Sequence, residues 1–171
     1  AGVQVLFSTL TGDIILDALI GAIFAIVSYS SLAAVLLTAT LTATGVISFK
    51  VALCLVIGAK LGSGLLAMLS ASKTNAAGRR VALGSLLFKT IGMVLILPFV
   101  NQLADQLDKL PINDEELVIF FHVFYNLIRC IVMVPFASAM ASLCTRLISD
   151  DVVDDQKVRA RHLDSSALDT P

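Results

Sequence analysis

Two polar interruptions inside long apolar stretches constrain the fold of this chain most strongly. A serine-rich run at 28–31 interrupts the apolar stretch 14–44, and a glycine-rich run at 58–64 interrupts the stretch that follows. A soluble hydrophobic core has no need of hydroxyls and glycines in such places. At membrane depth, however, backbone leaves the helix only where it is buried in protein or lines a cavity. The two interruptions therefore favour a solute-binding site inside a membrane.

The composition supports a membrane protein. Hydrophobic residues make up 57% of the chain and charged residues 15%, with a mean hydropathy of +0.92, well above the usual globular balance. The net charge of -1 provides no basic surface for nucleic acid. Apolar stretches separated by short charged loops predict an all-α, multi-pass membrane protein. No nucleophile–base pair, metal-ligand cluster or disulfide spacing is present, so we expect neither an enzyme nor a bound cofactor.

The length of the stretch 14–44 decides how it crosses the membrane. As one straight helix it would be about 46 Å long, which exceeds the hydrocarbon core of about 30 Å. Two complete spans would require about 40 residues. We therefore expect a re-entrant hairpin of two half-helices that meet at 28–31. One long tilted helix with a patch of serines is the alternative.

Residues 45–72 are expected to form a transmembrane helix that is broken at its glycine-rich run. Lys60 and Ser63 lie inside this run, and an unwound segment would free backbone amides and carbonyls to bind ligands beside them. A glycine cluster in a transmembrane helix is equally typical of close packing against a neighbouring helix. Both interpretations remain open from the sequence.

Residues 73–149 predict two paired transmembrane helices, over 81–100 and 117–137, joined by an acidic loop at 101–116. The first loop, 73–80, is basic, so the positive-inside rule places it in the cytoplasm and the acidic loop outside.

The two ends of the chain are expected to connect to missing parts of a longer protein. Residues 1–13 are interpreted as a lead-in from a missing N-terminal part. Residues 150–171 are interpreted as a cytoplasmic linker to a missing domain, because their charges are mixed in sign.

The two paired helices repeat one pattern, with polar positions at i, i+4 and i+7 on one helical face and a Pro-Phe pair after them. The repeated positions are Ser85, Lys89 and Gly92 in the first helix and His122, Asn126 and Arg129 in the second. A charged side chain at the centre of a membrane helix costs about 2.5–3.5 kcal/mol on insertion scales. Lys89 and Arg129 should therefore face protein or water, to serve either a solute or packing.

The order of these motifs resembles the bacterial sodium–phosphate cotransporter family, over most of the chain from residue 14 onward. The residues that carry the resemblance are Ser28, Ser30 and Ser31 at the hairpin tip, Thr42, Thr44 and Gly45 after it, Gly58, Lys60, Gly62 and Ser63 in the glycine-rich run, and Phe88, Gly92, His122 and Asn126 with the two Pro-Phe pairs. The tail resembles the linker that leads to a cytoplasmic PhoU-like domain in bacterial members.

The resemblance implies a symporter built from two inverted repeats, each with a serine-rich hairpin tip and a broken helix. This chain has one of each and resembles the second repeat, so a missing N-terminal repeat or a second copy is the expected partner. Phosphate is the implied substrate and sodium the implied coupling ion. The implied substrate-binding residues are Ser28, Ser30, Ser31, Gly58, Lys60, Gly62 and Ser63. The implied sodium-binding residues are Thr42, Thr44, Ser63 and Asn126.

Three motifs depart from the family pattern, at five residues in all. Ser28-Tyr29 stands where the family has Gln-Ser, Lys60 stands where it has Asn, and Ser85 and Lys89 replace a His and an Asn. One hypothesis is that the Lys60 ammonium takes the place of a bound sodium beside the anion. The alternative is that Lys60 extends along the span to the membrane surface, or marks a copy with an altered substrate.

The sequence therefore predicts half of a sodium-coupled transporter for phosphate or a related oxyanion. It would lie in the bacterial inner membrane with a cytoplasmic C-terminus. A non-transporting membrane anchor for a PhoU-like phosphate-regulatory protein is the alternative function, and a small channel or structural subunit is a third.

Overall fold

The computed structural model describes residues 13–150, and all its regular structure there is helical. The expected lead-in 1–13 and linker 150–171 lie, apart from Asp13 and Asp150, outside the described residues. The α-helices are α2 (Ile14–Val27), α3 (Ser31–Ala43), α4 (Phe49–Ala71), α5 (Ala76–Ile96), α6 (Val100–Leu107), α7 (Asp114–Met133) and α8 (Ala137–Leu147), with short 3-10 helices at Leu97–Phe99 and Val134–Phe136.

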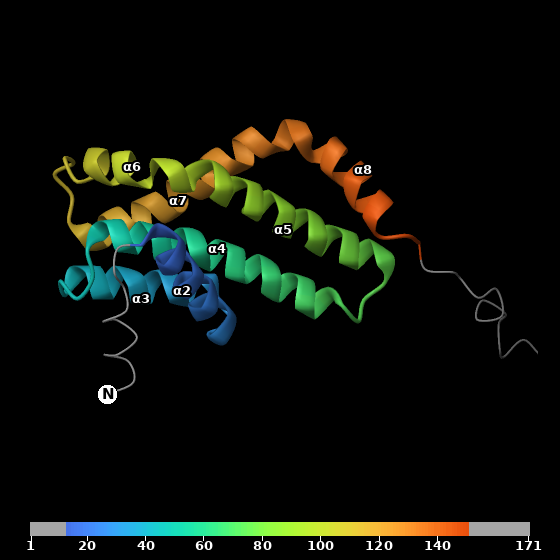
Figure 1. The fold of residues 1–171 in the computed structure, drawn as a ribbon, viewed down its shortest axis with the longest axis horizontal. Coiled ribbons are helices and arrows are strands. Elements are labelled where there is room, and N and C mark those ends of the chain that lie inside the picture. The colour runs from blue at the N-terminus through green and yellow to red at the C-terminus, as the bar shows by residue number, and fades with distance from the viewer. Residues whose placement is uncertain (1–12, 151–171) are drawn as a thin grey trace, which may run out of the picture.

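The predicted break at 28–31 is confirmed. The stretch 14–44 forms a hairpin, in which α2 and α3 are joined by residues 28–30. Their lengths of 14 and 13 residues give about 20 Å each, too short to cross a hydrocarbon core. After the tip, α3 runs back to the end of the molecule where the α6–α7 connection lies (Figure 1). The chain then turns into α4 at Gly45, whose φ of 69° is readily adopted by glycine.

The predicted break in the helix over 45–72 is wrong, because α4 is continuous through its glycine-rich run. Gly58 and Gly62, one helical turn apart, lie against the backbone of α2. A methyl group at either position would overlap the carbonyl of Ala18 or Ala22, respectively. The glycines therefore allow two helix backbones to approach closely, which is the packing interpretation of the same residues.

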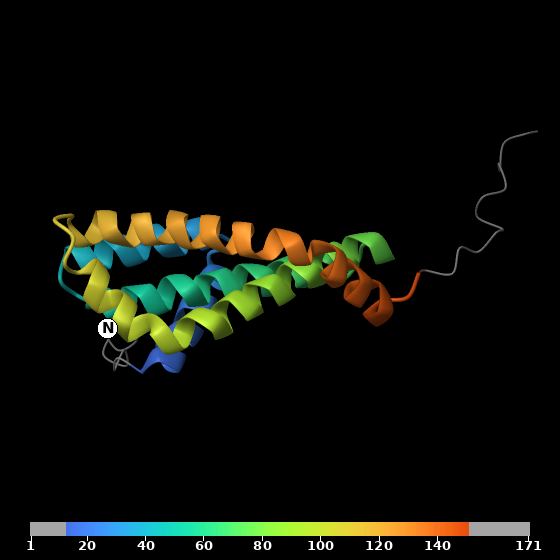
Figure 2. The ribbon, with the colours of Figure 1, turned by 90° about the horizontal axis from the view of Figure 1, so that it is seen from above.

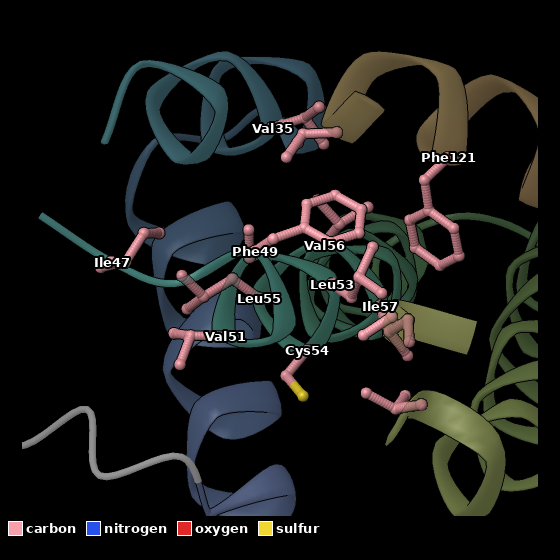
Figure 3. Close-up of a cluster of buried hydrophobic side chains, with 14 of the residues drawn as sticks. Val35, Ile47, Phe49, Val51, Leu53, Cys54, Leu55, Val56, Ile57 and Phe121 are labelled. Atoms are coloured by element: carbon pink, nitrogen blue, oxygen red, sulfur yellow. The ribbon is translucent and has the colours of Figure 1, made fainter. Parts of the chain in front are cut away.

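Helix α4 is the centre of the structure, and its N-terminal half is buried on all sides. Figure 3 shows Leu53 and Ile57 of α4 surrounded by side chains that include Val35 of α3 and Phe121 of α7. Val100 of α6 belongs to the same cluster. A helix that is apolar around its whole circumference is stable only when neighbours cover it, and here α2, α3, α6 and α7 do so.

The last two spans are each bent at a Pro-Phe pair. Pro98 and Pro135 lie in the two short 3-10 helices, where α5 passes into α6 and α7 into α8. Proline cannot donate the next helical hydrogen bond, so the axis bends before the helix resumes. The prediction of a loop over 101–116 is wrong in its first part, because α6 extends through Leu107 and buries Val100 and Ala104.

Three helical stretches are long and apolar enough to cross a membrane. They are Phe49–Ala71, Ala76–Leu107 and Asp114–Leu147. Much of the apolar surface of the last two is exposed, as at Val94 and Ile131, and such surface suits contact with lipid. Figure 2 shows α7 along one side of the bundle and α4 and α5 along the other, with α8 crossing over the N-terminal end of α5. The predicted class, an all-α membrane protein, is confirmed.

Candidate functional site

The serine tip of the hairpin is held in shape by its own hydroxyls. The Ser28 hydroxyl lies 2.7 Å from the carbonyl of Phe24 and 2.9 Å from that of Ser30. The Ser30 hydroxyl accepts a hydrogen bond from the amide of Ala33 at 3.1 Å and caps α3. Tyr29 between them has a φ of 52°, which reverses the chain direction. Two of the predicted substrate-binding hydroxyls are therefore engaged locally.

The tip lies beside the middle of α4. Ala25 and Ala34, each about one turn from the tip, pack together against Ala59 of α4. Lys60 follows Ala59 in α4, so the N-terminus of α3, where a helix carries partial positive charge, lies against the same turn of α4 as that lysine. The structure thus places the hairpin tip and the polar run of α4 in one region, as predicted.

Lys60 and Ser63 meet a side chain from α5. Lys60 is 6% exposed, and Ser63 donates a hydrogen bond to the Lys60 carbonyl at 2.8 Å. The Lys89 ammonium donates to the Ser63 hydroxyl at 3.1 Å. Two lysines are thereby connected through one serine, which joins α4 to α5.

Helix α7 adds a third cation through its polar face. The Lys60 ammonium lies 3.2 Å from Nε2 of His122. Asn126 donates to the His122 carbonyl at 2.9 Å, and its side-chain oxygen accepts from Arg129 at 3.3 Å. We call Lys60, Lys89 and Arg129 the cationic cluster, because these hydrogen bonds connect them across three helices.

Three hydrogen-bonding groups beside the cluster have no protein partner among the described residues. They are Nδ1 of His122, the hydroxyl of Tyr125 and Nη1 of Arg129, all of them buried. A protonated lysine only donates, so Nε2 of His122 accepts from Lys60 and the ring proton is on Nδ1. His122 and Arg129 therefore each present a buried donor without an acceptor. Buried groups of this kind normally have a hydrogen-bond partner.

No carboxylate neutralises the cationic cluster within residues 13–150. The ion pair there joins Arg80 to Asp150, at the end of the bundle. Asp17 is also buried and its oxygens lack a partner in the described part, but the cation near it is Lys50. Each cation of the cluster lies close to the midpoint of its span. Three uncompensated charges at that depth would cost roughly 8–10 kcal/mol on insertion scales, so the arrangement is suited to an anion.

The predicted sodium-binding residues lie in two separate places. Thr42 and Thr44 are near the C-terminus of α3, where their hydroxyls donate to backbone carbonyls of the same helix. Ser63 and Asn126 lie in the middle of the bundle, within the hydrogen bonds of the cationic cluster. The structure brings the second pair into one region and leaves the threonines about three to four helical turns from the hairpin tip.

The sequence identified part of this site. Lys60, Ser63 and Asn126 were predicted, whereas Gly58 and Gly62 contact α2 instead of exposing free amides. Lys89 and Arg129 were expected to face protein or water, which the structure confirms. The roles of His122 and Tyr125 were missed, although their spacing on the polar face of α7 was a usable signal.

Comparison with known proteins identifies the family. A sequence model described as "Na+/Pi-cotransporter" matches residues 1–109, which is more than half of the chain. The chain belongs to this family. The matched region contains α2 to α6 and therefore Lys60, Ser63 and Lys89, while α7 with His122 and Arg129 lies beyond it.

Two curated relatives match nearly the whole chain. A protein of Salmonella typhimurium and one of Escherichia coli K12, each called "Putative inorganic phosphate export protein YjbB", are 69% and 68% identical to the chain over 170 residues. These matches include 99% of the chain but 31% of each relative. Uncharacterized protein YqeW of Bacillus subtilis is 22% identical over 130 residues, 76% of the chain and 42% of that protein. No solved structure matches the chain.

Proposed function

We propose that this chain is part of the transport domain of an inorganic phosphate transporter, and that the cationic cluster binds the phosphate. The observation that carries the proposal is the cluster itself: three cations from three helices, near mid-span, with no carboxylate beside them in the described residues. The cotransporter family and the names of the YjbB relatives support phosphate as the anion.

The chemistry of the cluster suits a tetrahedral oxyanion. The guanidinium of Arg129 forms strong, directional hydrogen bonds to phosphate oxygens, and the lysines add charge. The two buried donors, on His122 and Arg129, and the Tyr125 hydroxyl would gain phosphate oxygens as partners. The N-terminus of α3 at the hairpin tip adds a favourable dipole. A site that only binds and releases phosphate needs no catalytic nucleophile. We therefore propose that the site serves transport and not an enzymatic reaction.

The rest of the transporter is part of the proposal. In transport the phosphate site has to open to each side of the membrane in turn, which in transporters with internal repeats occurs between two repeats. A missing N-terminal repeat or a second copy would complete the site in the inner membrane. The basic residues Lys73, Arg79 and Arg80 would be cytoplasmic by the positive-inside rule, and the C-terminus with them. The comparisons provide no support for a PhoU-associated membrane anchor.

Sodium coupling is proposed from the family description. Three cations within the cluster would repel a further cation, so a sodium ion in this chain would bind away from Lys60. The Lys60 ammonium would then compensate charge beside the phosphate. Comparing phosphate transport into proteoliposomes with and without a sodium gradient tests the coupling. If the Lys60 ammonium takes the place of a bound sodium, phosphate transport by Lys60→Asn should depend more strongly on sodium than transport by the unchanged protein.

The proposal is tested by phosphate transport in proteoliposomes that contain the intact protein. Arg129→Gln removes one cation of the cluster, and we expect transport to fall at least tenfold, because hydrogen bonds to charged groups contribute about 1.5–3 kcal/mol. Lys73→Gln is the matched control, since it removes an exposed positive charge outside the cluster. Equal phosphate transport by the two variants would refute binding at the cluster.

A further inference from the structure

A groove between α5 and α8 leads from one end of the bundle to the cationic cluster. Its volume is about 560 Å³, which leaves space for on the order of ten water molecules. Arg80 lines it at the end of the bundle, and Lys89 and Arg129 line its inner end. Arg80 and Lys89 are about 14 Å apart along α5, so cations lie at both ends of the groove.

The walls between these cations are mixed: apolar side chains such as Phe88 and Met140 alternate with small and polar ones. Ser85 faces the groove from α5 and Thr145 from α8. A methyl group at Gly84 would lie 3.5 Å from the sulfur of Cys144. Because glycine has no side chain, this part of the groove between α5 and α8 stays open.

Arg80 is held at the mouth of the groove by the chain that follows α8. Its Nε donates to the carbonyl of Ile148 at 2.9 Å, and its Nη1 lies 2.8 Å from a carboxylate oxygen of Asp150. The Asp150 side chain is 83% exposed. Exposed ion pairs contribute about 0–1 kcal/mol, so another anion can replace this carboxylate at little cost.

We propose that the groove between α5 and α8 is the path by which phosphate passes between the cationic cluster and the basic end of the bundle. Arg80 is a positioning residue at the mouth of the groove. Its guanidinium releases the Asp150 carboxylate and pairs instead with the arriving or departing anion. This inference rests on the proposed function, because it assumes that the cluster binds phosphate. It adds a direction of access and a residue outside the cluster.

Thiol modification in the intact, otherwise cysteine-free protein tests the path. Ser85→Cys places a thiol in the groove, and Thr145→Cys is a second position on the opposite wall. Each is treated with an anionic and a cationic methanethiosulfonate reagent, with rates normalised to those of a free thiol. Val94→Cys is the control on the same helix, because Val94 is 60% exposed on the apolar surface of α5.

At both groove positions we expect the normalised reaction rate of the anionic reagent to exceed that of the cationic one by at least about fivefold. Inorganic phosphate should slow the reaction of the anionic reagent severalfold. Arg80→Gln should reduce the preference, Asp150→Asn should increase it, and the control thiol should react slowly with either reagent. No reaction in the groove, no preference for the anion, or no protection by phosphate would each overturn the path. If Arg129→Gln still abolishes transport in that case, the path alone fails and the phosphate site stands.

Discussion

Replacing Gly58 by alanine tests how the hairpin is held against α4. A methyl group at this position would overlap the Ala18 carbonyl of α2. Because the obstacle is backbone, no side-chain rotation relieves the overlap. To restore a normal contact of about 3.5 Å, the two helices must separate locally by more than about 1 Å. Gly84→Ala is a matched control, since its methyl group would meet side-chain atoms of Cys144 and Met140 at the ordinary distances of 3.5 and 3.7 Å.

The expected difference in stability follows from two opposing terms. Alanine gains up to about 1 kcal/mol over glycine inside a helix, and both variants receive this gain. Overpacking of a close contact costs about 1–3 kcal/mol, and Gly58→Ala alone has this cost. Gly58→Ala should therefore be about 1–3 kcal/mol less stable than Gly84→Ala. A combined Gly58→Ala and Gly62→Ala variant should lose less than the sum of the two, because one separation of α2 from α4 relieves both overlaps.

Thermal unfolding of the intact protein in detergent measures the difference. A thiol-reactive fluorogenic dye reports the exposure of Cys54, which is fully buried on α4, once the other buried thiol, Cys144, is replaced by serine in all variants. Cys130 is exposed and is replaced by serine in all variants to lower the background. Gly58→Ala should unfold several degrees below Gly84→Ala. If the two unfold at the same temperature, or in the opposite order, the glycines of α4 are not a close-packing face.

Three further predictions concern the hairpin tip and the cluster. Tyr29→Gly should raise stability by about 1 kcal/mol relative to Tyr29→Ala in the same unfolding assay, because a positive φ disfavours residues with a Cβ. Ser30→Ala should lower it by about 1 kcal/mol through loss of the α3 cap, and a neutral result would contradict the capping role. Lys89→Met should weaken phosphate binding to the purified protein by at least about tenfold, while Ser63→Ala should weaken it less; unchanged binding in Lys89→Met would remove Lys89 from the site.

The hairpin was predictable from the sequence because length and chemistry agreed. The stretch 14–44 is too long for one span and too short for two, and its serines occur where a turn is required. Whether α4 is continuous or unwound at its glycines was not predictable in this way. Gly58 and Gly62 are compatible with an unwound segment and with close helix packing, and only the position of α2 distinguishes the two. That position depends on contacts between residues that are far apart in sequence.

The cationic cluster was predictable in part for a similar reason. The spacing of Lys89 and Arg129 showed that each lies on a polar helical face, and their cost in lipid required protein or water around them. Helical spacing does not show which faces meet. The hydrogen bonds from Lys60 to His122 and from Lys89 to Ser63 depend on how α4, α5 and α7 cross, and this is a tertiary property.

The contacts of the hairpin tip bear on which groups would hold phosphate under the proposed function. The hydroxyl of Ser28 donates to backbone carbonyls and that of Ser30 accepts from a backbone amide, so both are occupied in building the turn. Arg129 and His122, in contrast, present buried donors without protein acceptors in the described part of the molecule. To donate to an anion, the Ser28 hydroxyl would first have to give up its bond to a backbone carbonyl, whereas the cations and the unpaired donors would not. Under the proposed function, the hairpin would act mainly through position: it packs against α4 at Ala59, while the side chains of α4, α5 and α7 would supply the charge.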